Sequence, residues 1–157
     1  MTKILIIGYG NPGRLDYGLG PAFAKAVKQY NIKGVNTDSD YQLTVEDAVD
    51  IAEHDIVIFA DADVSGPEPF YLKAIQPSKS VTFSSHSITA ENLLALAYEL
   101  FQKDIKAYAL GIRGYEFNEY DERLSAKAQS NLKNAIEFIK KSIEKDCFSE
   151  IRAHFKV

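Results

Sequence analysis

Three side chains capable of acid–base and metal chemistry each follow a predicted β-strand in this sequence. Asp16 lies in a glycine-rich loop after the apolar run 4–7, Asp61 directly follows the run 56–60, and His86 follows a weaker run. Two carboxylates and one imidazole suit a divalent metal of the zinc or nickel type and leave room for water or a substrate group. The carboxyl ends of parallel strands meet at one edge of a sheet, so the sequence predicts a single site there.

Each of these residues also has a structural interpretation. An aspartate in a turn, such as Asp16, is typically solvated. Asp61 could instead cap a turn or the element that follows it. A lone histidine in a loop, such as His86, is more often structural than a ligand. His54 lies at the start of a predicted strand, at the opposite edge of the sheet, and His154 lies in the tail. Neither is expected to join the site.

The elements that must position these side chains alternate between strand and helix patterns along the whole chain. This alternation predicts an α/β fold with a mostly parallel sheet. The runs 3–7 and 56–60 are continuous, apolar and rich in β-branched residues, which is typical of strands buried on both faces. We expect further strands at 70–75, 80–83 and 106–112, with the first two at a sheet edge, and a polar turn at 36–40.

Four helices follow from capping residues and apolar periodicity. One is expected to begin near Pro21, because proline is tolerated in a first turn, and to end near Tyr30. Thr44, Thr89 and Ser125 are predicted N-caps of the others, the last of which extends to about residue 144. Residues predicted to face the core include Phe23, Ala24, Val27, Ala48, Ile51, Leu93, Leu94, Leu96, Ala97, Leu100, Leu132, Ala135, Ile136 and Ile139. No repeat or linker interrupts the pattern, so residues 1–157 are predicted to form a single domain.

The loop between the first strand and helix matches the GxGxxG pattern of dinucleotide-binding proteins. In such proteins the helix begins inside the motif, so that its N-terminus faces a pyrophosphate. Here Pro12 favours an extended conformation at the residue before it. Gly18, Gly20 and Pro21 would be costly inside a helix that began so early. We therefore expect a long loop and a later helix start, and nucleotide binding stays a minor alternative.

Composition excludes several classes of function. The net charge is −4, without a basic block, which argues against nucleic acid as the main partner. Cys147 is the only cysteine, so no disulfide framework or cysteine metal cluster is expected, and packing is its predicted role. The sequence has no signal-peptide pattern and no apolar run long enough to span a membrane. These features predict a cytoplasmic protein without membrane contacts.

The opening loop and the strand-end residues together resemble the hydrogenase maturation endopeptidases of nickel–iron hydrogenases. In that family the first strand leads into a loop of pattern G-x-G-N-x-x-x-x-D-(D or E)-G-x-G, which reads here as Gly8-Tyr9-Gly10-Asn11 and then Asp16-Tyr17-Gly18-Leu19-Gly20. The second strand-end acid of the family resembles Asp61 in Asp61-Ala62. Its histidine before a leucine-rich helix resembles His86. Two late segments are matched at 111–113 and 124–125, both without the family's proline.

This resemblance implies a fold, an activity and a partner. The fold is a phosphorylase/hydrolase-like three-layer α/β/α sandwich. The activity is that of an aspartic-type endopeptidase, a hydrolase that removes a C-terminal extension from the hydrogenase large-subunit precursor once nickel has been inserted. The enzyme is expected to be a monomer without a permanently bound cofactor. Nickel is expected to arrive with the precursor and to be recognised by Asp61 and His86.

The third ligand is the point at which the chain departs from the family pattern. The family uses the second acid of its acid pair, and Tyr17 occupies that position here. Tyrosine is neutral near pH 7 and is a poor ligand for divalent nickel. Either Asp16, one residue earlier, serves as third ligand or base, or the site is altered. The alternative function is therefore a diverged paralogue that binds a metalloprotein precursor without cleaving it.

Overall fold

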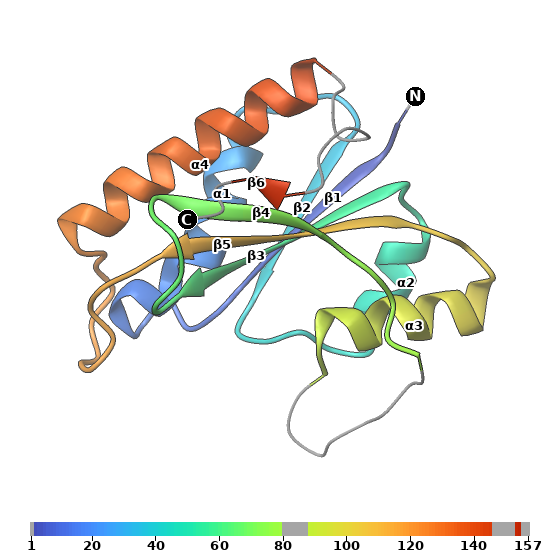
Figure 1. Ribbon diagram of the computed structural model, residues 1–157, viewed down its shortest axis with the longest axis horizontal. Helices are drawn as coiled ribbons and strands as arrows, with labels where there is room; N and C mark the ends of the chain where they lie inside the picture. The colour runs from blue at the N-terminus through green and yellow to red at the C-terminus, as the bar shows by residue number, and fades with distance from the viewer. Residues whose placement is uncertain (1, 80–87, 146–152, 155–157) are drawn as a thin grey trace.

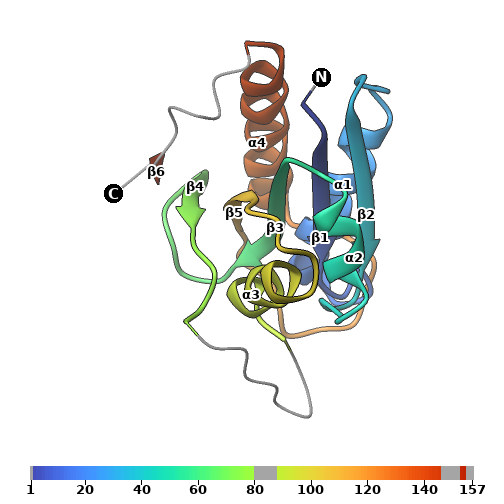
Figure 2. The ribbon, with the colours of Figure 1, turned by 90° about the vertical axis from the view of Figure 1, so that its right-hand side faces the viewer.

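The computed structural model (Figure 1) describes residues 2–79, 88–145 and 153–154 and contains one mixed β-sheet. The strands are β1 (Ile4–Tyr9), β2 (Val35–Asp40), β3 (Ile56–Asp63), β4 (Phe70–Ile75), β5 (Lys106–Arg113) and β6 (Ala153–His154). Their order is β2-β1-β3-β5-β4-β6, which Figure 2 shows from right to left. β2, β1, β3 and β5 are parallel, whereas β4 and β6 are antiparallel to their neighbours.

Helices cover both faces of this sheet, which confirms the predicted three-layer α/β/α architecture. α1 (Leu19–Lys28) and α4 (Ala126–Glu144) pack on one face, and α2 (Asp47–Ala52) and α3 (Ala90–Phe101) pack on the other. Figure 1 shows α4 and the pair α2 and α3 on opposite sides of the strands. A short 3-10 turn, η1 (Leu15–Gly18), precedes α1.

The central strands are apolar on both sides because each side contacts helices. In β1, Ile4 and Ile6 pack towards α1 and α4, while Leu5 and Ile7 pack towards α2 and α3. β3 alternates in the same way along its first five residues. The same alternation determines which face of the sheet the residues at the carboxyl ends of β1 and β3 point to.

Two of the predicted helix caps are confirmed. The Thr89 hydroxyl accepts a hydrogen bond from Asn92 N over 3.1 Å at the start of α3. Ser125 does the same for Ala128 N over 3.3 Å at the start of α4. The prediction that Leu100 is buried is wrong, since it is 60% exposed near the end of α3.

Residues 36–40 were predicted as a polar turn, and that prediction is also wrong. They form most of β2, an edge strand paired in parallel with β1. Composition disfavours a strand here, but β1 supplies the hydrogen-bonding partner, and an edge position keeps polar side chains in solvent. The pairing extends past the strand, where Gly10 N donates to Asp40 O over 3.0 Å.

The late start of α1 is confirmed and has a packing reason. A Cβ atom on Gly20 would lie 2.3 Å from Tyr9 O and 2.6 Å from Ala60 O. The first turn of α1 therefore rests directly on the ends of β1 and β3, and only glycine permits that approach. The glycines of this loop serve helix–strand packing.

Within the ranges that the structure describes, no helix combines the length and the apolar character that crossing a membrane requires.

Candidate functional site

A row of residues crosses the carboxyl edge of the parallel strands on the face covered by α2 and α3. Asp61 of β3 pairs with Gly111 of β5, and Gly111 pairs with Tyr71 of β4. On the other side, the register Gly8 to Ala60 makes Tyr9 of β1 the next neighbour of Asp61. Residues paired in this way direct their side chains to the same face. Tyr9, Asp61 and Tyr71 thus form one cluster.

Asp61 is the charged centre of this cluster. Its Oδ1 accepts a hydrogen bond from Ala62 N over 2.8 Å, and the Tyr9 hydroxyl donates a second hydrogen bond to the carboxylate. Burial raises the pKa of Asp61 to about 6, since the hydrogen bonds only partly offset burial and the nearby negative charge of Asp63. A carboxyl group that exchanges its proton near neutral pH can act as an acid, a base or a metal ligand.

Tyr71 forms the opposite wall of the cluster. A Cβ atom on Gly111 would lie 2.1 Å from the Tyr71 ring, so the ring covers Gly111, the strand neighbour of Asp61. Burial, together with the negative charges of Asp63, Asp61 and Glu91, raises the pKa of the Tyr71 phenol. Glu91 belongs to the first turn of α3, so this helix begins close to the cluster.

Asp16 is buried and held by four hydrogen bonds from the far side of the chain. Its Oδ2 accepts from Tyr115 N (2.7 Å), Glu116 N (3.0 Å) and the Ser125 hydroxyl (2.7 Å), and its Oδ1 accepts from Ser125 N (2.8 Å). Burial would raise the pKa of Asp16, but these hydrogen bonds lower it below its ordinary value. We refer to this arrangement of Asp16 with residues 115, 116 and 125 as the Asp16 clamp.

One expectation about Asp16 needs correction, and its predicted place beside Asp61 stays a prediction. Asp16 is not a solvated turn residue, because it is 0% exposed. Its oxygens are occupied by protein donors, so in this state it presents no free carboxylate to a metal. The Asp16 clamp holds Ser125, which caps α4 on the α1 and α4 face, whereas Asp61 lies on the α2 and α3 face.

Tyr17, at the position of the family acid, belongs to an aromatic cluster next to the clamp. Its ring centroid lies 4.6 Å from that of Phe117, and the Arg14 guanidinium lies 5.4 Å from the Tyr17 ring and 5.3 Å from the Tyr120 ring. Arg14 is thus within cation–π distance of both tyrosine rings. Arg14 Nε is buried without a hydrogen-bond partner among the described residues.

The predictions for His86 and His54 have different outcomes. His86 lies outside the described residues, so its predicted place beside Asp61 stays a prediction. His54 is buried, with Nδ1 2.6 Å from Asp50 O and Nε2 2.8 Å from Asn36 Nδ2. Its structural role, away from the candidate site, agrees with expectation.

A second group of acids lies at β2 and α2. One carboxylate oxygen from each of Asp38, Asp47 and Asp50 lies within 4.8 Å of the others. Asp47 is buried, and its Oδ2 accepts from Thr44 N over 2.9 Å. Burial, the largest influence, and its acidic neighbours raise the pKa of Asp47. These acids lie where β2 and α2 approach each other.

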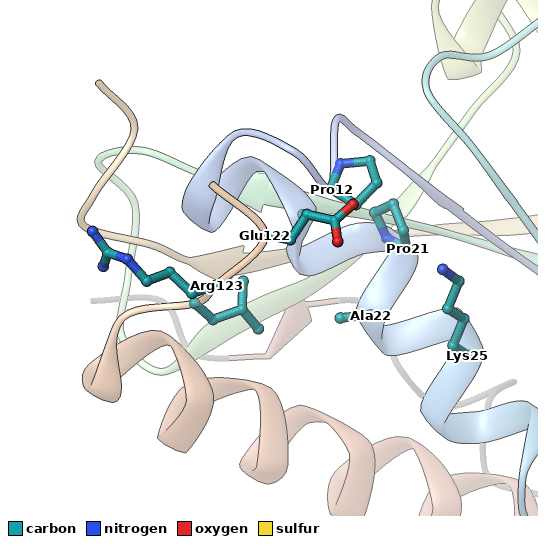
Figure 3. A pocket seen from close by; sticks show the side chains of 8 residues that line it. Pro12, Pro21, Ala22, Lys25, Glu122 and Arg123 are labelled. Atoms are coloured by element: carbon teal, nitrogen blue, oxygen red, sulfur yellow. The ribbon is translucent and has the colours of Figure 1, made fainter. Parts of the chain in front are cut away.

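A groove of about 310 Å³ opens beside the loop between β1 and α1 (Figure 3). Figure 3 shows Pro12, Pro21 and the Glu122 carboxylate close together, with Lys25 one turn further along α1 and Arg123 directed away from them. The groove borders α1 and the segment before α4, so it is separate from the Asp61 cluster.

The chain is a three-layer α/β/α domain with an ionisable residue, Asp61, near the carboxyl end of a central parallel strand. No family model and no curated protein sequence matches the chain. Solved structures of hydrogenase maturation proteases share its fold. HybD from E. coli, a hydrogenase maturating endopeptidase, has a TM-score of 0.72 at 19% identity and covers 96% of each chain.

Two archaeal proteins of the same kind are also similar. The NiFe hydrogenase maturation protease HycI from Thermococcus kodakarensis has a TM-score of 0.71 at 21% identity and covers 91% of this chain and 93% of its own. HybD from the same organism has a TM-score of 0.61 at 22% identity, with 88% and 97% covered. These likenesses establish that the chain has the fold of hydrogenase maturation proteases.

Sequence reasoning missed Tyr9 and Tyr71. Tyr9 occupies the variable position of the GxGxxG match, and Tyr71 lies in a strand that was assigned only to the sheet edge. The sequence does contain a signal for Tyr9. In β1, Tyr9 alternates in step with Leu5 and Ile7, which face α2 and α3. In β3, Asp61 alternates in step with Val57 and Phe59, which face the same helices. Because side chains two residues apart in a strand lie on the same face of the sheet, Tyr9 and Asp61 share one face.

Proposed function

We propose that this protein is a maturation endopeptidase that removes the C-terminal extension of a nickel-loaded hydrogenase large-subunit precursor. The observation that carries the proposal is Asp61, a half-buried carboxyl with a raised pKa at the end of a central strand, in a chain with the fold of such proteases. The resemblance of the opening loop and of Asp61-Ala62 to the family pattern supports it independently.

In the proposed reaction, water adds across one peptide bond of the precursor, which yields a new C-terminal carboxylate and a released peptide with a free amine. Nickel belongs to the substrate and polarises the scissile carbonyl or a water molecule bound to it. Asp61 and His86 engage the nickel, and Asp61 is able to accept a proton near neutral pH. Asp16 holds the opening loop against residues 115, 116 and 125 through the Asp16 clamp.

The proposed enzyme acts in the cytoplasm as a monomer and has no metal of its own. Its partner is the large-subunit precursor. The predicted role of Asp16 as third ligand would require the clamp to open, which would leave four donors near Ser125 without their acceptor. Asp61 and His86 are therefore the residues on which the proposal depends.

Incubation of the purified protein with a matched, nickel-loaded precursor tests this function. Intact mass spectrometry should detect a shortened large subunit and a released C-terminal peptide. Asp61→Asn should abolish the release, and precursor without nickel should stay uncut. An uncut nickel-loaded precursor, with the wild-type protein in excess, would remove the proposal.

The alternative, a paralogue that binds the precursor without cleaving it, is motivated by Tyr17. Its ring packs against Phe117 at an interplanar angle of 56°, at the position where the family pattern has an acid. Tyr17→Glu distinguishes the two functions. Cleavage by the wild-type chain excludes the alternative, whereas cleavage that appears only after Tyr17→Glu supports it.

A further inference from the structure

Tyr9 contacts Asp61 through a register that the sheet itself imposes. β1 and β3 pair in parallel up to Gly8 and Ala60, and the next residue of each strand, Tyr9 and Asp61, faces α2 and α3. The Tyr9 hydroxyl reaches the carboxylate of its neighbour and donates a hydrogen bond to it. This contact needs no loop to adopt a special conformation.

The Tyr9 phenol is a neutral hydrogen-bond donor near pH 7, because the ordinary pKa of a phenol is about 10. It donates one hydrogen bond to the Asp61 carboxylate. Ala62 N donates another to Oδ1. Two ionised carboxylate oxygens offer about four lone-pair sites, so roughly two remain for a cation or a substrate proton.

Among the described neighbours of Asp61, Tyr9 is the side chain suited to orient its carboxylate. Gly111, the strand neighbour of Asp61 on the other side, has no side chain, and the Tyr71 ring covers it. Tyr71 contributes a wall, and no hydrogen bond from its hydroxyl to Asp61 is found in the described part of the chain. Asp63 and Glu91 are acids near the cluster and repel the carboxylate, while the Lys73 ammonium lies 5.4 Å from the Tyr71 ring centroid.

We propose that Tyr9 is a positioning residue, whose hydroxyl holds the Asp61 carboxylate in one orientation so that its remaining lone pairs face the incoming metal-loaded substrate. This inference rests on the proposed function for its consequence, but the orientation itself is a property of the free protein. Hydrogen bonds to a ligating carboxylate commonly contribute about 10- to 100-fold to metal affinity or activity. Tyr9→Phe removes only the hydroxyl and keeps the packing of the ring.

Two readouts test the proposal. In the first, side-chain couplings measured by NMR report the χ1 rotamer of Asp61 in the free protein. The wild type and Tyr71→Phe should show one rotamer, and Tyr9→Phe should show an average over several. In the second, the cleavage assay should give kcat/KM about 10- to 100-fold lower for Tyr9→Phe. Tyr98→Phe, which removes a hydroxyl from an exposed side chain on α3, should match the wild type.

The outcomes separate this proposal from the proposed function. Unchanged Asp61 couplings in Tyr9→Phe would overturn the positioning role, whatever the cleavage assay gives. A wild-type activity in Tyr9→Phe would overturn it too. Failure of the wild-type protein to cleave any matched precursor would overturn the proposed function, and rotamer averaging in Tyr9→Phe would then still establish what holds Asp61. Thermal unfolding of each variant verifies that the fold is retained.

Discussion

Asp16→Asn should weaken the folded state strongly, because it replaces the acceptor on which the Asp16 clamp depends. In the better of its two orientations, the new amide keeps its oxygen at the Oδ2 position, where three donors converge. Its NH2 group then faces Ser125 N, which loses its acceptor and is itself buried. The other orientation would lose three hydrogen bonds.

The expected loss follows from these contacts. One hydrogen bond to a charged group contributes about 1.5–3 kcal/mol, and a buried donor left unsatisfied costs about 1–3 kcal/mol. The two effects overlap, so we expect a loss of about 3–5 kcal/mol in the free energy of unfolding at neutral pH. That is a large share of the roughly 5–15 kcal/mol that stabilises a typical domain.

The loss should depend on pH with a defined sign. The folded-state pKa of Asp16 is lowered, so its stabilising contribution is complete above the unfolded pKa of about 3.9. The contribution disappears as the pH falls through the folded-state value. The difference between wild type and Asp16→Asn should therefore shrink in acid and stay constant between about pH 5 and pH 8.

Urea unfolding followed by circular dichroism measures this difference at each pH. Asp121→Asn is the matched control, because Asp121 is exposed and forms an ion pair with Arg123 at 3.1 Å. Surface pairs of this kind contribute about 0–1 kcal/mol. A loss below about 1 kcal/mol for Asp16→Asn, or a loss that is independent of pH, would refute the reasoning.

Three further predictions concern stability. Because the folded-state pKa of Asp61 is raised to about 6, ionisation of this carboxyl destabilises the folded state as the pH rises from about 4 to about 6. Asp61→Asn removes that ionisation, so it should raise the free energy of unfolding by about 1–3 kcal/mol at pH 8 and leave it unchanged in acid. Urea unfolding measures both values. Gly20→Ala should cost about 2–3 kcal/mol, while Gly13→Ala, whose Cβ would meet only Asn11 Oδ1 at 3.3 Å, should cost under about 1 kcal/mol. Thr89→Ala should lower the melting temperature through the loss of about 1 kcal/mol of N-cap energy.

Much of the fold follows from short-range patterns in the sequence. Continuous apolar runs identified β1 and β3, the segment 106–112 was also predicted as a strand and forms β5, and Thr89 and Ser125 identified the starts of two helices. An apolar run or a capping residue is defined by a few consecutive residues, so it can be recognised without knowing the tertiary structure. The mostly parallel sheet with helices on both faces then follows from the alternation of elements.

The parts that sequence reasoning missed depend on distant partners. β2 is a strand because β1 pairs with it, although its own residues favour a turn. The Asp16 clamp forms because Ser125, 109 residues away in the sequence, packs against Asp16 in the fold. Asp61 does lie near the carboxyl end of β3, as predicted, but tertiary packing decides which residues contact each acid.

The Asp16 clamp also has a consequence for the order of folding. Its donors lie about 100 residues after the loop that they complete, so the contact closes most of the chain into one long loop. Contacts of such high sequence separation form late, since their loop-closure entropy must be offset first. During synthesis, the first strand and helix of this protein emerge long before Ser125 does. The opening loop therefore takes its final shape only after Ser125, 109 residues beyond Asp16, has been made.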